Sequence, residues 1–498
     1  MTIPLQRGAV ARELPRSRAT LFHTPYNLGV ALLLSAVSVL LMGVVNQSLW
    51  IVSLATLCAT LGFGALDIAR ARQGGVTPAT LYAVGAALTA YANMRGLLSA
   101  DGPRRSLYFI YTVESKLDLA IWLNLAGAIL PILGFYALMR QPLLRIVPDV
   151  LPNVSGSVSD RRLVTGALVL AGFAIAVRLV TPLAALGTLG TIFFEIPTFA
   201  TFALARMGTW RGIPRAGSAA LIIALAEIAR ALYQSYLRVE LVTPLFAFAL
   251  GSIIGARSFA PLRSRLFLPI YVVGALFIVS FGALGHLRTT SAGGVARVKE
   301  VYEYQLSADS VAASEQQTIV SRLTSFNQLS QIGRIVEEDG FLEGQTLAYL
   351  GFAFIPRFLW PEKPTIAKGP WFALRIGQAR VNEQGRITNA VNMTIPGELY
   401  LNFGWLGTIL GCLAYGAFLG TLWLKTNFWT EPRNVLGSAF GYYLLITGVG
   451  LAADLQTIVT LIALYLLFLV AGAGLRRFGR RKRAHSHGGS LAGAREAR

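Results

Sequence analysis

The sequence predicts an all-α polytopic membrane protein, and two observations lead to that fold class. Of the 498 residues, 54% are hydrophobic and only 14% are charged, a balance that excludes a soluble multidomain protein. The apolar residues gather in segments of roughly 16 to 26 residues, and about 20 are needed to cross the hydrocarbon layer. We therefore expect about 12 transmembrane helices, within a range of roughly 11 to 14.

The expected helices are placed by the apolar segments in chain order. They occupy residues 27–45, 49–66, 78–97, 119–139, 163–181, 183–205, 218–234, 240–256, 266–284, 399–424, 436–451 and 455–475. The chain then divides into an N-terminal tail (1–26), nine helices (27–284), a large loop (285–398), three helices (399–475) and a basic C-terminal tail (476–498). The loop is long enough to form a small folded unit over one face of the helices.

The positive charges orient this arrangement. The net charge is +20, which in a soluble chain would suggest nucleic acid. Most lysines and arginines, however, lie in the two tails and in the loops that fall on the same side as the tails, as the positive-inside rule requires. We therefore expect both termini in the cytoplasm, the large loop outside, membrane lipids around the helices and no nucleic-acid partner.

Several kinds of site have no sequence support. The only two cysteines, Cys58 and Cys412, lie in apolar segments, so neither a disulfide nor a zinc site is expected. The chain has no glycine-rich phosphate loop and no HExxH motif. Nucleotide-driven transport and zinc hydrolysis are thus disfavoured, and we expect no metal and no cofactor.

The large loop should be mostly helical. Ser314 and Gln317 form a capping-box pattern, and apolar residues then recur at spacings of three and four until about Gly340, which predicts an amphipathic helix whose stripe packs on the protein itself or on the membrane surface. A shorter helix is expected over 295–306. The apolar segment 346–355 is too short to span a membrane, so we expect a re-entrant or interfacial segment.

Acidic residues outside the apolar segments suggest solvated positions. Glu337, Glu338 and Asp339 form the densest acidic cluster, and the end of an amphipathic helix favours a solvated face over a metal site. Asp67 lies at the end of an expected helix and is also predicted to be solvated.

Cations held near the outer side form a candidate phosphate site. In the stretch Ile-Pro-Arg-Phe-Leu-Trp-Pro-Glu-Lys-Pro (355–364) three prolines stiffen the backbone around Arg357 and Lys363. Arginine presents a forked donor to phosphate oxygens and lysine a compact charge. Contact with lipid headgroups is the alternative for these side chains.

Ionisable residues within the expected helices are a second signal, because such residues are costly there and face the protein interior. Arg178, Glu195, Glu227 and Arg230 meet this description. Glu227 and Arg230 lie three residues apart on one helix and could instead neutralise each other. In the expected topology Arg178, Arg238, Arg288 and Arg357 lie in the outer half of the membrane or at its outer rim, which predicts a positively charged cavity that opens outward.

Two motifs resemble a known family. Ile-Pro-Arg-x-x-Trp-Pro-x-Lys-Pro (355–364), followed by Pro-Gly-Glu-Leu-Tyr-x-Asn-Phe-Gly-x-x-Gly (396–407), resembles the oligosaccharide repeat-unit polymerases, the O-antigen polymerase (Wzy-type) superfamily of bacterial inner membranes. The resemblance covers residues 322–407, and the rest of the chain agrees in hydropathy alone. It implies a GT-C-like, metal-independent glycosyltransferase. Such an enzyme polymerises repeat units linked to polyprenyl pyrophosphate at the periplasmic face, for O-antigen, capsule or exopolysaccharide. A chain-length regulator and a flippase are its expected partners.

Roles for individual residues follow from this resemblance. Arg357 and Lys363 would bind the pyrophosphate and stabilise its departing charge. Glu398 would be the general base for the acceptor hydroxyl, with His286, the only histidine predicted outside, as the second candidate. The further expected members of the pyrophosphate clamp are Arg178, Arg230, Arg238 and Arg288.

Three alternatives remain at this point. An O-antigen ligase performs the same chemistry with a different acceptor, but these enzymes usually depend on a histidine in the large loop, and here only His286 at its start is available. A lipid-linked oligosaccharide flippase would share the cationic cavity, but a large structured outer loop counts against it. A non-catalytic assembly protein would have no need of buried charges.

Overall fold

The computed structural model describes most of the helical part of the chain. The described residues are 19–70, 76–99, 109, 111–138, 159–180, 188–234, 238–257, 260–279, 323–351, 360, 362, 368–381, 387, 389–426, 435–449, 458, 461–462, 464–466 and 469–470. Within these residues the secondary structure is helical apart from one isolated bridge between Val381 and Ile387.

The helices follow eleven of the expected segments closely, and the twelfth, 455–475, lies largely outside the described residues. They are α1 (Ala19–Val45), α2 (Leu49–Arg70), α3 (Pro78–Leu98), α5 (Leu117–Leu138), α6 (Asp160–Val180), α7 (Thr188–Arg211), α8 (Pro214–Gln234), α9 (Arg238–Ala256), α10 (Leu268–Val279), α15 (Phe326–Asp339), α16 (Lys368–Arg375), α17 (Ile395–Lys425) and α18 (Val435–Val449). Short 3-10 helices are η2 (Glu114–Lys116), η6 (Ala260–Arg263), η7 (Arg265–Phe267) and η8 (Gln345–Gly351). Among the described residues, 6 helices are long and apolar enough to cross a membrane. The chain is therefore a multi-pass membrane protein.

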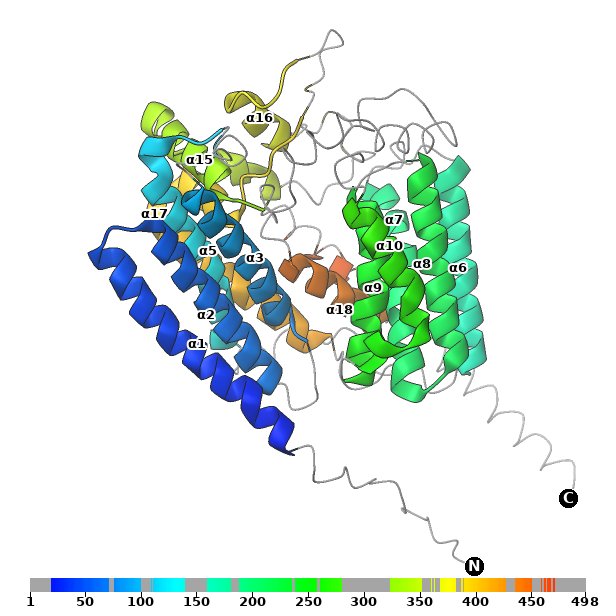
Figure 1. Ribbon diagram of the computed structural model, residues 1–498. Helices are drawn as coiled ribbons and strands as arrows, with labels where there is room; N and C mark the ends of the chain where they lie inside the picture. The colour runs from blue at the N-terminus through cyan, green and yellow to red at the C-terminus, as the bar shows by residue number, and fades with distance from the viewer. Residues whose placement is uncertain are drawn as a thin grey trace, which may run out of the picture.

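Two groups of helices make up the membrane part (Figure 1). One group contains α1, α2, α3, α5 and α17, and the other contains α6 to α10. Helix α18 packs against α3 and against α7, so it joins the groups. A shared core of buried aromatic side chains includes Phe135, Phe202, Tyr415, Phe440 and Tyr442.

Glycines allow α5 and α17 to pack with their backbones in close contact. A Cβ atom added to Gly416 would lie 1.8 Å from the carbonyl oxygen of Pro131, and one added to Gly134 would lie 2.1 Å from that of Leu413. Small residues are typical of membrane helix interfaces, where close backbone approach replaces the hydrophobic effect as the source of stability. The position of α17, which carries the candidate site, is thus set by its contact with α5.

Contacts between helix ends agree with alternating helix directions. Arg178 at the end of α6 contacts Glu227 near the end of α8 and Glu240 at the start of α9. Arg206 near the end of α7 donates a hydrogen bond to Ser438 at the start of α18, at 2.6 Å. Each contact joins ends that the expected topology places on the same side of the membrane.

Asp67, at the end of α2, corrects one expectation. It is only 5% exposed and accepts hydrogen bonds from the hydroxyl groups of Thr77, Thr80 and Tyr136. Thr77 also caps the start of α3 by accepting from Ala79 N at 3.1 Å. The prediction of a solvated Asp67 is wrong. The carboxylate lies at the positive end of α3, where it accepts hydrogen bonds from the hydroxyl groups of Thr77 and Thr80.

Helix α15 confirms the amphipathic helix expected near the end of the large loop. It ends at Gly340, whose φ of 79° suits a glycine C-cap, and its buried face includes Phe326, Leu329 and Ile332. The stripe packs against α5 and α17, so it faces the protein itself. The helix begins at Phe326 with Ser325 at its N-cap, and residues 323–325 are not helical, so the expected start at Ser314 and Gln317 is wrong. The expected helix over 295–306 lies outside the described residues.

The start of α15 is hydrogen-bonded to the membrane helices. Ser325 Oγ donates to Asn124 Oδ1 of α5 at 2.8 Å, and Ser325 N donates to Asn93 Oδ1 of α3 at 3.0 Å. All three residues are buried. Such a satisfied buried network gives the loop helix a defined position on the bundle, and α15 and α16 lie together at one end of it (Figure 1).

Candidate functional site

Helix α17 is broken near its start. Gly404 has φ 65° and ψ −152°, values outside the helical range, so two helical pieces meet there. Glycine adopts this left-handed φ at little cost, whereas other residues would be strained. Irregular backbone within a membrane protein is tolerated where other protein groups satisfy it, and broken helices of this kind often mark binding sites.

The loop after α15 supplies those groups. Leu342 N donates to the carbonyl oxygen of Leu401 at 3.0 Å, and Glu343 N donates to that of Asn402 at 3.1 Å. The carbonyls released by the break are therefore satisfied by a segment of the large loop. This segment leads directly into η8, the described part of the expected re-entrant region 346–355.

A buried polar cluster lies one turn before the break. We call it the Glu398 cluster, made of Glu398, Lys368, Thr346 and Asn402. Glu398 is 0% exposed and accepts hydrogen bonds from Lys368 Nζ and, at 3.0 Å, from Thr346 Oγ1. Asn402 donates to Thr346 Oγ1 at 2.7 Å and to the carbonyl oxygen of Glu398 at 2.7 Å. The cluster thus unites α17 with η8 and α16 of the large loop.

The electrostatics of Glu398 explain why an ionised carboxylate is stable there. A buried charge is strongly unfavourable unless it is paired and hydrogen-bonded. Lys368 supplies the opposite charge, and the first turn of α17 presents its positive end to an acidic side chain. Among the described residues, Lys368 and Thr346 therefore help to hold the buried carboxylate of Glu398 in place.

The first turn of α17 is also covered by α15. A Cβ atom added to Gly397 would lie 2.5 Å from Ile332 Cδ1 and 3.0 Å from Leu329 Cδ2. On its outer face α15 forms exposed ion pairs, in which Arg375 contacts Asp339 at 2.5 Å and Lys116 contacts Glu337 at 2.8 Å. The acidic end of α15 is therefore exposed, as expected from its sequence.

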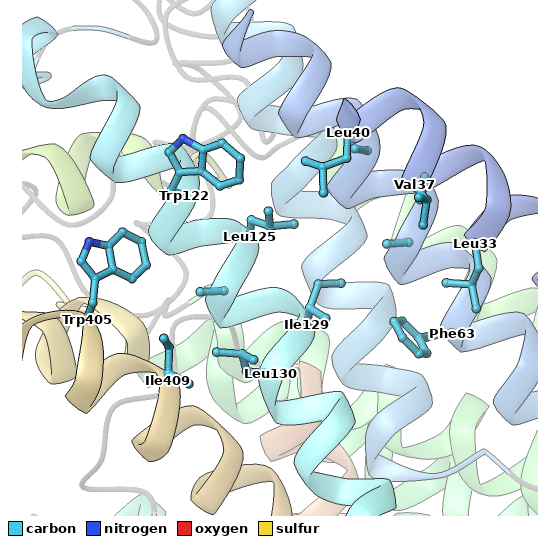
Figure 2. A pocket seen from close by; sticks show the side chains of 14 residues that line it. Leu33, Val37, Leu40, Phe63, Trp122, Leu125, Ile129, Leu130, Trp405 and Ile409 are labelled. Atoms are coloured by element: carbon cyan, nitrogen blue, oxygen red, sulfur yellow. The ribbon is translucent and has the colours of Figure 1, made fainter. Parts of the chain in front are cut away.

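An apolar groove borders the same helix (Figure 2). Its volume is about 710 Å³, and all of its lining side chains are aliphatic or aromatic. They come from α1, α2, α5 and α17, and include Leu33, Val37, Trp122, Ile129, Trp405 and Ile409. Trp405 follows the break at Gly404, so the groove begins where the Glu398 cluster ends along α17. The groove suits a hydrocarbon chain.

A second buried group of charges lies between α6, α8 and α9. We call it the α6–α9 charge cluster, made of Arg178, Glu227, Arg230 and Glu240. Glu227 Oε1 accepts from Arg178 Nη1, and it accepts from Arg230 Nε at 3.0 Å and Nη2 at 2.8 Å. Glu240 Oε2 lies 2.5 Å from Arg230 Nη2 and 3.7 Å from Arg178 Nη2.

These contacts bear on two expectations. The ion pair between Glu227 and Arg230 on one helix is confirmed. Among the described contacts, Glu227 and Glu240 pair with both arginines, whose side chains are only 2% and 3% exposed. A pyrophosphate would have to displace these glutamates before it reached Arg178 or Arg230. The assignment of the two arginines to the pyrophosphate clamp therefore stays a prediction, and it requires that displacement.

Several predicted site residues lie outside the described part of the chain. They are His286, Arg288, Arg357 and Lys363. The backbone of Arg238 begins α9, but its side chain is also outside the description. The structure therefore describes Glu398, Arg178 and Arg230 among the predicted site residues, and it places the first in one cluster and the two arginines in another.

Sequence reasoning missed three members of the Glu398 cluster. Lys368 belongs to a basic stretch that gave no sign of its partner 30 positions away, and Thr346 lies in a segment chosen for its apolar length. Asn402 lies within the motif 396–407, but the sequence alone assigns no role to its side chain. Its position one turn after Glu398 is the signal that could have linked the two.

Comparisons with known proteins add no assignment. The chain matches no protein-family model, no curated protein and no solved structure.

Proposed function

We propose that this protein is a polymerase of lipid-linked oligosaccharide repeat units. In this reaction a growing chain leaves its polyprenyl pyrophosphate carrier and is joined to a sugar hydroxyl of a new lipid-linked repeat unit. The observation that carries the proposal is that one broken helix, α17, carries both a fully buried, lysine-paired carboxylate and two of the residues that line an all-apolar groove, Trp405 and Ile409. The second of the two motifs that resemble O-antigen polymerases, residues 396–407, lies at the start of that helix.

The chemical step assigns a role to Glu398. The acceptor hydroxyl oxygen forms a bond to the anomeric carbon of the donor, and the bond from that carbon to the pyrophosphate oxygen breaks. The hydroxyl proton goes to Glu398, and the electron pair of the broken bond leaves with the pyrophosphate. The same residue would need an ionised carboxylate, which Lys368 and Thr346 stabilise.

The groove would hold the polyprenyl chain of a substrate. An isoprenoid chain offers only hydrocarbon, which matches a lining without charged side chains. Glu398 and Trp405 both lie on α17, on either side of the break at Gly404, so the reacting sugar and the lipid chain would be held by the same helix. Arg357 and Lys363 would bind the pyrophosphate and stabilise its departing charge.

The wider assignment follows from the same proposal. The protein would have about 12 transmembrane helices, a GT-C-like fold and cytoplasmic termini, and it would act at the periplasmic face of a bacterial inner membrane. A chain-length regulator and a flippase would be its partners. The α6–α9 charge cluster would stabilise the second helix group, and its arginines would join the clamp only if substrate displaced the glutamates.

The proposal is tested with purified protein in liposomes. The substrate is the pool of lipid-linked repeat units extracted from the membranes of the organism that makes this protein. We expect a ladder of longer lipid-linked chains, and Glu398→Gln should lower its rate by about 100-fold or more. Glu337→Gln, which changes an exposed carboxylate on α15, is the matched control and should retain activity.

The alternatives give different products in the same assay. A ligase would transfer the glycan to an acceptor that carries no pyrophosphate, and a flippase would move the repeat units between leaflets without a new glycosidic bond. A ladder that Glu398→Gln forms at the wild-type rate would remove Glu398 from the chemistry.

A further inference from the structure

Asn402 has an incomplete set of hydrogen bonds. It is 1% exposed, and its amide nitrogen donates to Thr346 Oγ1 and to the carbonyl oxygen of Glu398. Its amide oxygen Oδ1 is buried and accepts no hydrogen bond from any residue that the structure describes. Because a buried acceptor without a donor is costly, such an atom beside a reactive group points to a ligand that completes it.

The neighbouring groups determine which way the amide faces. Thr346 has one hydroxyl proton and donates it to Glu398 Oε1 at 3.0 Å, so it can only accept from Asn402. The carbonyl oxygen of Glu398 also only accepts. If the amide nitrogen and oxygen of Asn402 exchanged places, the oxygen would face two acceptors and no donor. The nitrogen therefore faces Thr346 Oγ1 and the carbonyl oxygen of Glu398, and Oδ1 is the atom without a hydrogen bond among the described residues.

A ligand that completes Asn402 must therefore donate a hydrogen bond. Sugar hydroxyls and acetamido N–H groups donate, whereas ionised phosphate and carboxylate oxygens only accept. The adjacent carboxylate of Glu398 would also repel an anion. The chemistry at this position thus selects a neutral sugar and disfavours a pyrophosphate.

We propose that Asn402 Oδ1 binds a hydroxyl or acetamido N–H group of the acceptor sugar, so that the Glu398 cluster is the acceptor subsite of the enzyme. This inference rests on the proposed function and adds to it the substrate end that the cluster recognises. Bound in this way, one sugar donor group pairs with Asn402 while a neighbouring hydroxyl meets Glu398.

The cluster is closed in this structure. Glu398 and Asn402 are buried, and the described loop residues that contact them include Glu343, Thr346 of η8 and Lys368 of α16. An acceptor sugar would therefore reach the two side chains after some of these loop contacts open. The incoming sugar hydroxyl then replaces contacts that the loop made.

The test measures the KM for a varied lipid-linked single repeat unit at a saturating concentration of preformed lipid-linked chain. Asn402→Leu removes Oδ1, and we expect it to raise the acceptor KM by about tenfold or more while the donor KM stays near wild type. Thr346→Val is the matched control, because it breaks the same hydrogen-bond chain and leaves Oδ1 in place. It should raise the acceptor KM much less.

Other results would overturn the inference. If Asn402→Leu and Thr346→Val raise the acceptor KM equally, or if Asn402→Leu leaves it unchanged, Asn402 only orders the cluster and binds no sugar. Asn402→Ala, which only removes atoms, is measured in the same way if the leucine variant does not fold. A wild-type protein that forms no polymer would contradict the proposed function, whereas polymer formation with an unchanged acceptor KM in the variants contradicts this inference alone.

Discussion

The ion pair between Lys368 and Glu398 should be strongly coupled, and substitution of Lys368 by methionine tests this. The side chains of Lys368 and Glu398 are 8% and 0% exposed. Removal of one partner from a buried pair leaves the other charge poorly compensated and costs about 3–5 kcal/mol. We therefore expect Lys368→Met to lower the free energy of unfolding by roughly that amount.

The double variant Lys368→Met/Glu398→Gln tests whether the loss of stability comes from leaving the charge of Glu398 unpaired. It removes both charges, and replacement of a whole buried pair is often nearly neutral. The double variant should therefore be more stable than Lys368→Met alone. The measurement is the free energy of unfolding from denaturation by sodium dodecyl sulfate in mixed micelles, compared across the wild type, both single variants and the double variant.

An exposed ion pair provides the matched control. Lys116 and Glu337 are 22% and 65% exposed at the side chain and lie 2.8 Å apart. Because exposed pairs contribute about 0.2–1 kcal/mol, Lys116→Met should have a small effect. The reasoning fails if Lys368→Met costs no more than Lys116→Met, or if the double variant is no more stable than Lys368→Met.

Three further predictions concern packing, the pyrophosphate and metal dependence. Gly416→Ala should lower the free energy of unfolding by about 1–3 kcal/mol, because its Cβ atom would lie 1.8 Å from Pro131 O, whereas Gly172→Ala, with open space around it, should not destabilise; equal effects in the same titration would contradict the close contact. Arg357→Ala should lower the polymerisation rate by about two to three decades, and Arg357→Lys should not restore it fully, since an ammonium lacks the forked donor; full activity of either variant in the liposome assay would argue against a clamp role. Polymerisation should continue in EDTA, because fixed cations stabilise the leaving group in this account, and a loss of activity that added Mg²⁺ reverses would contradict it.

The membrane helices could be predicted well because their signal is local. Apolar length placed α3 over Pro78–Leu98 and α9 over Arg238–Ala256 within two residues of the expected ends. Helix α1 begins at Ala19, eight positions before its expected apolar start, since hydropathy marks the membrane core and not the end of the helical backbone. The periodic pattern and Gly340 likewise located the end of α15.

The polar contacts could not be predicted in the same way because they are not local. Asp67 looked like a residue at a helix end, and only the fold brings the hydroxyl of Tyr136 to it. Lys368 looked like one of several basic loop residues, and its pairing with Glu398 requires the docking of the large loop on α17. Glu398 itself was chosen through its motif, and the structure adds the partners that stabilise its charge.

The most direct test of the central claim is the stoichiometry of glycosyl transfer by the purified protein. Lipid-linked repeat units labelled in the sugar and in the pyrophosphate are incubated with the protein in liposomes, and the free polyprenyl pyrophosphate and the new glycosidic bonds are counted. We expect each new bond to release one polyprenyl pyrophosphate, and we expect Glu398→Gln to lower both quantities together. Movement of repeat units across the bilayer without bond formation, or release of polyprenyl pyrophosphate without chain growth, would contradict it.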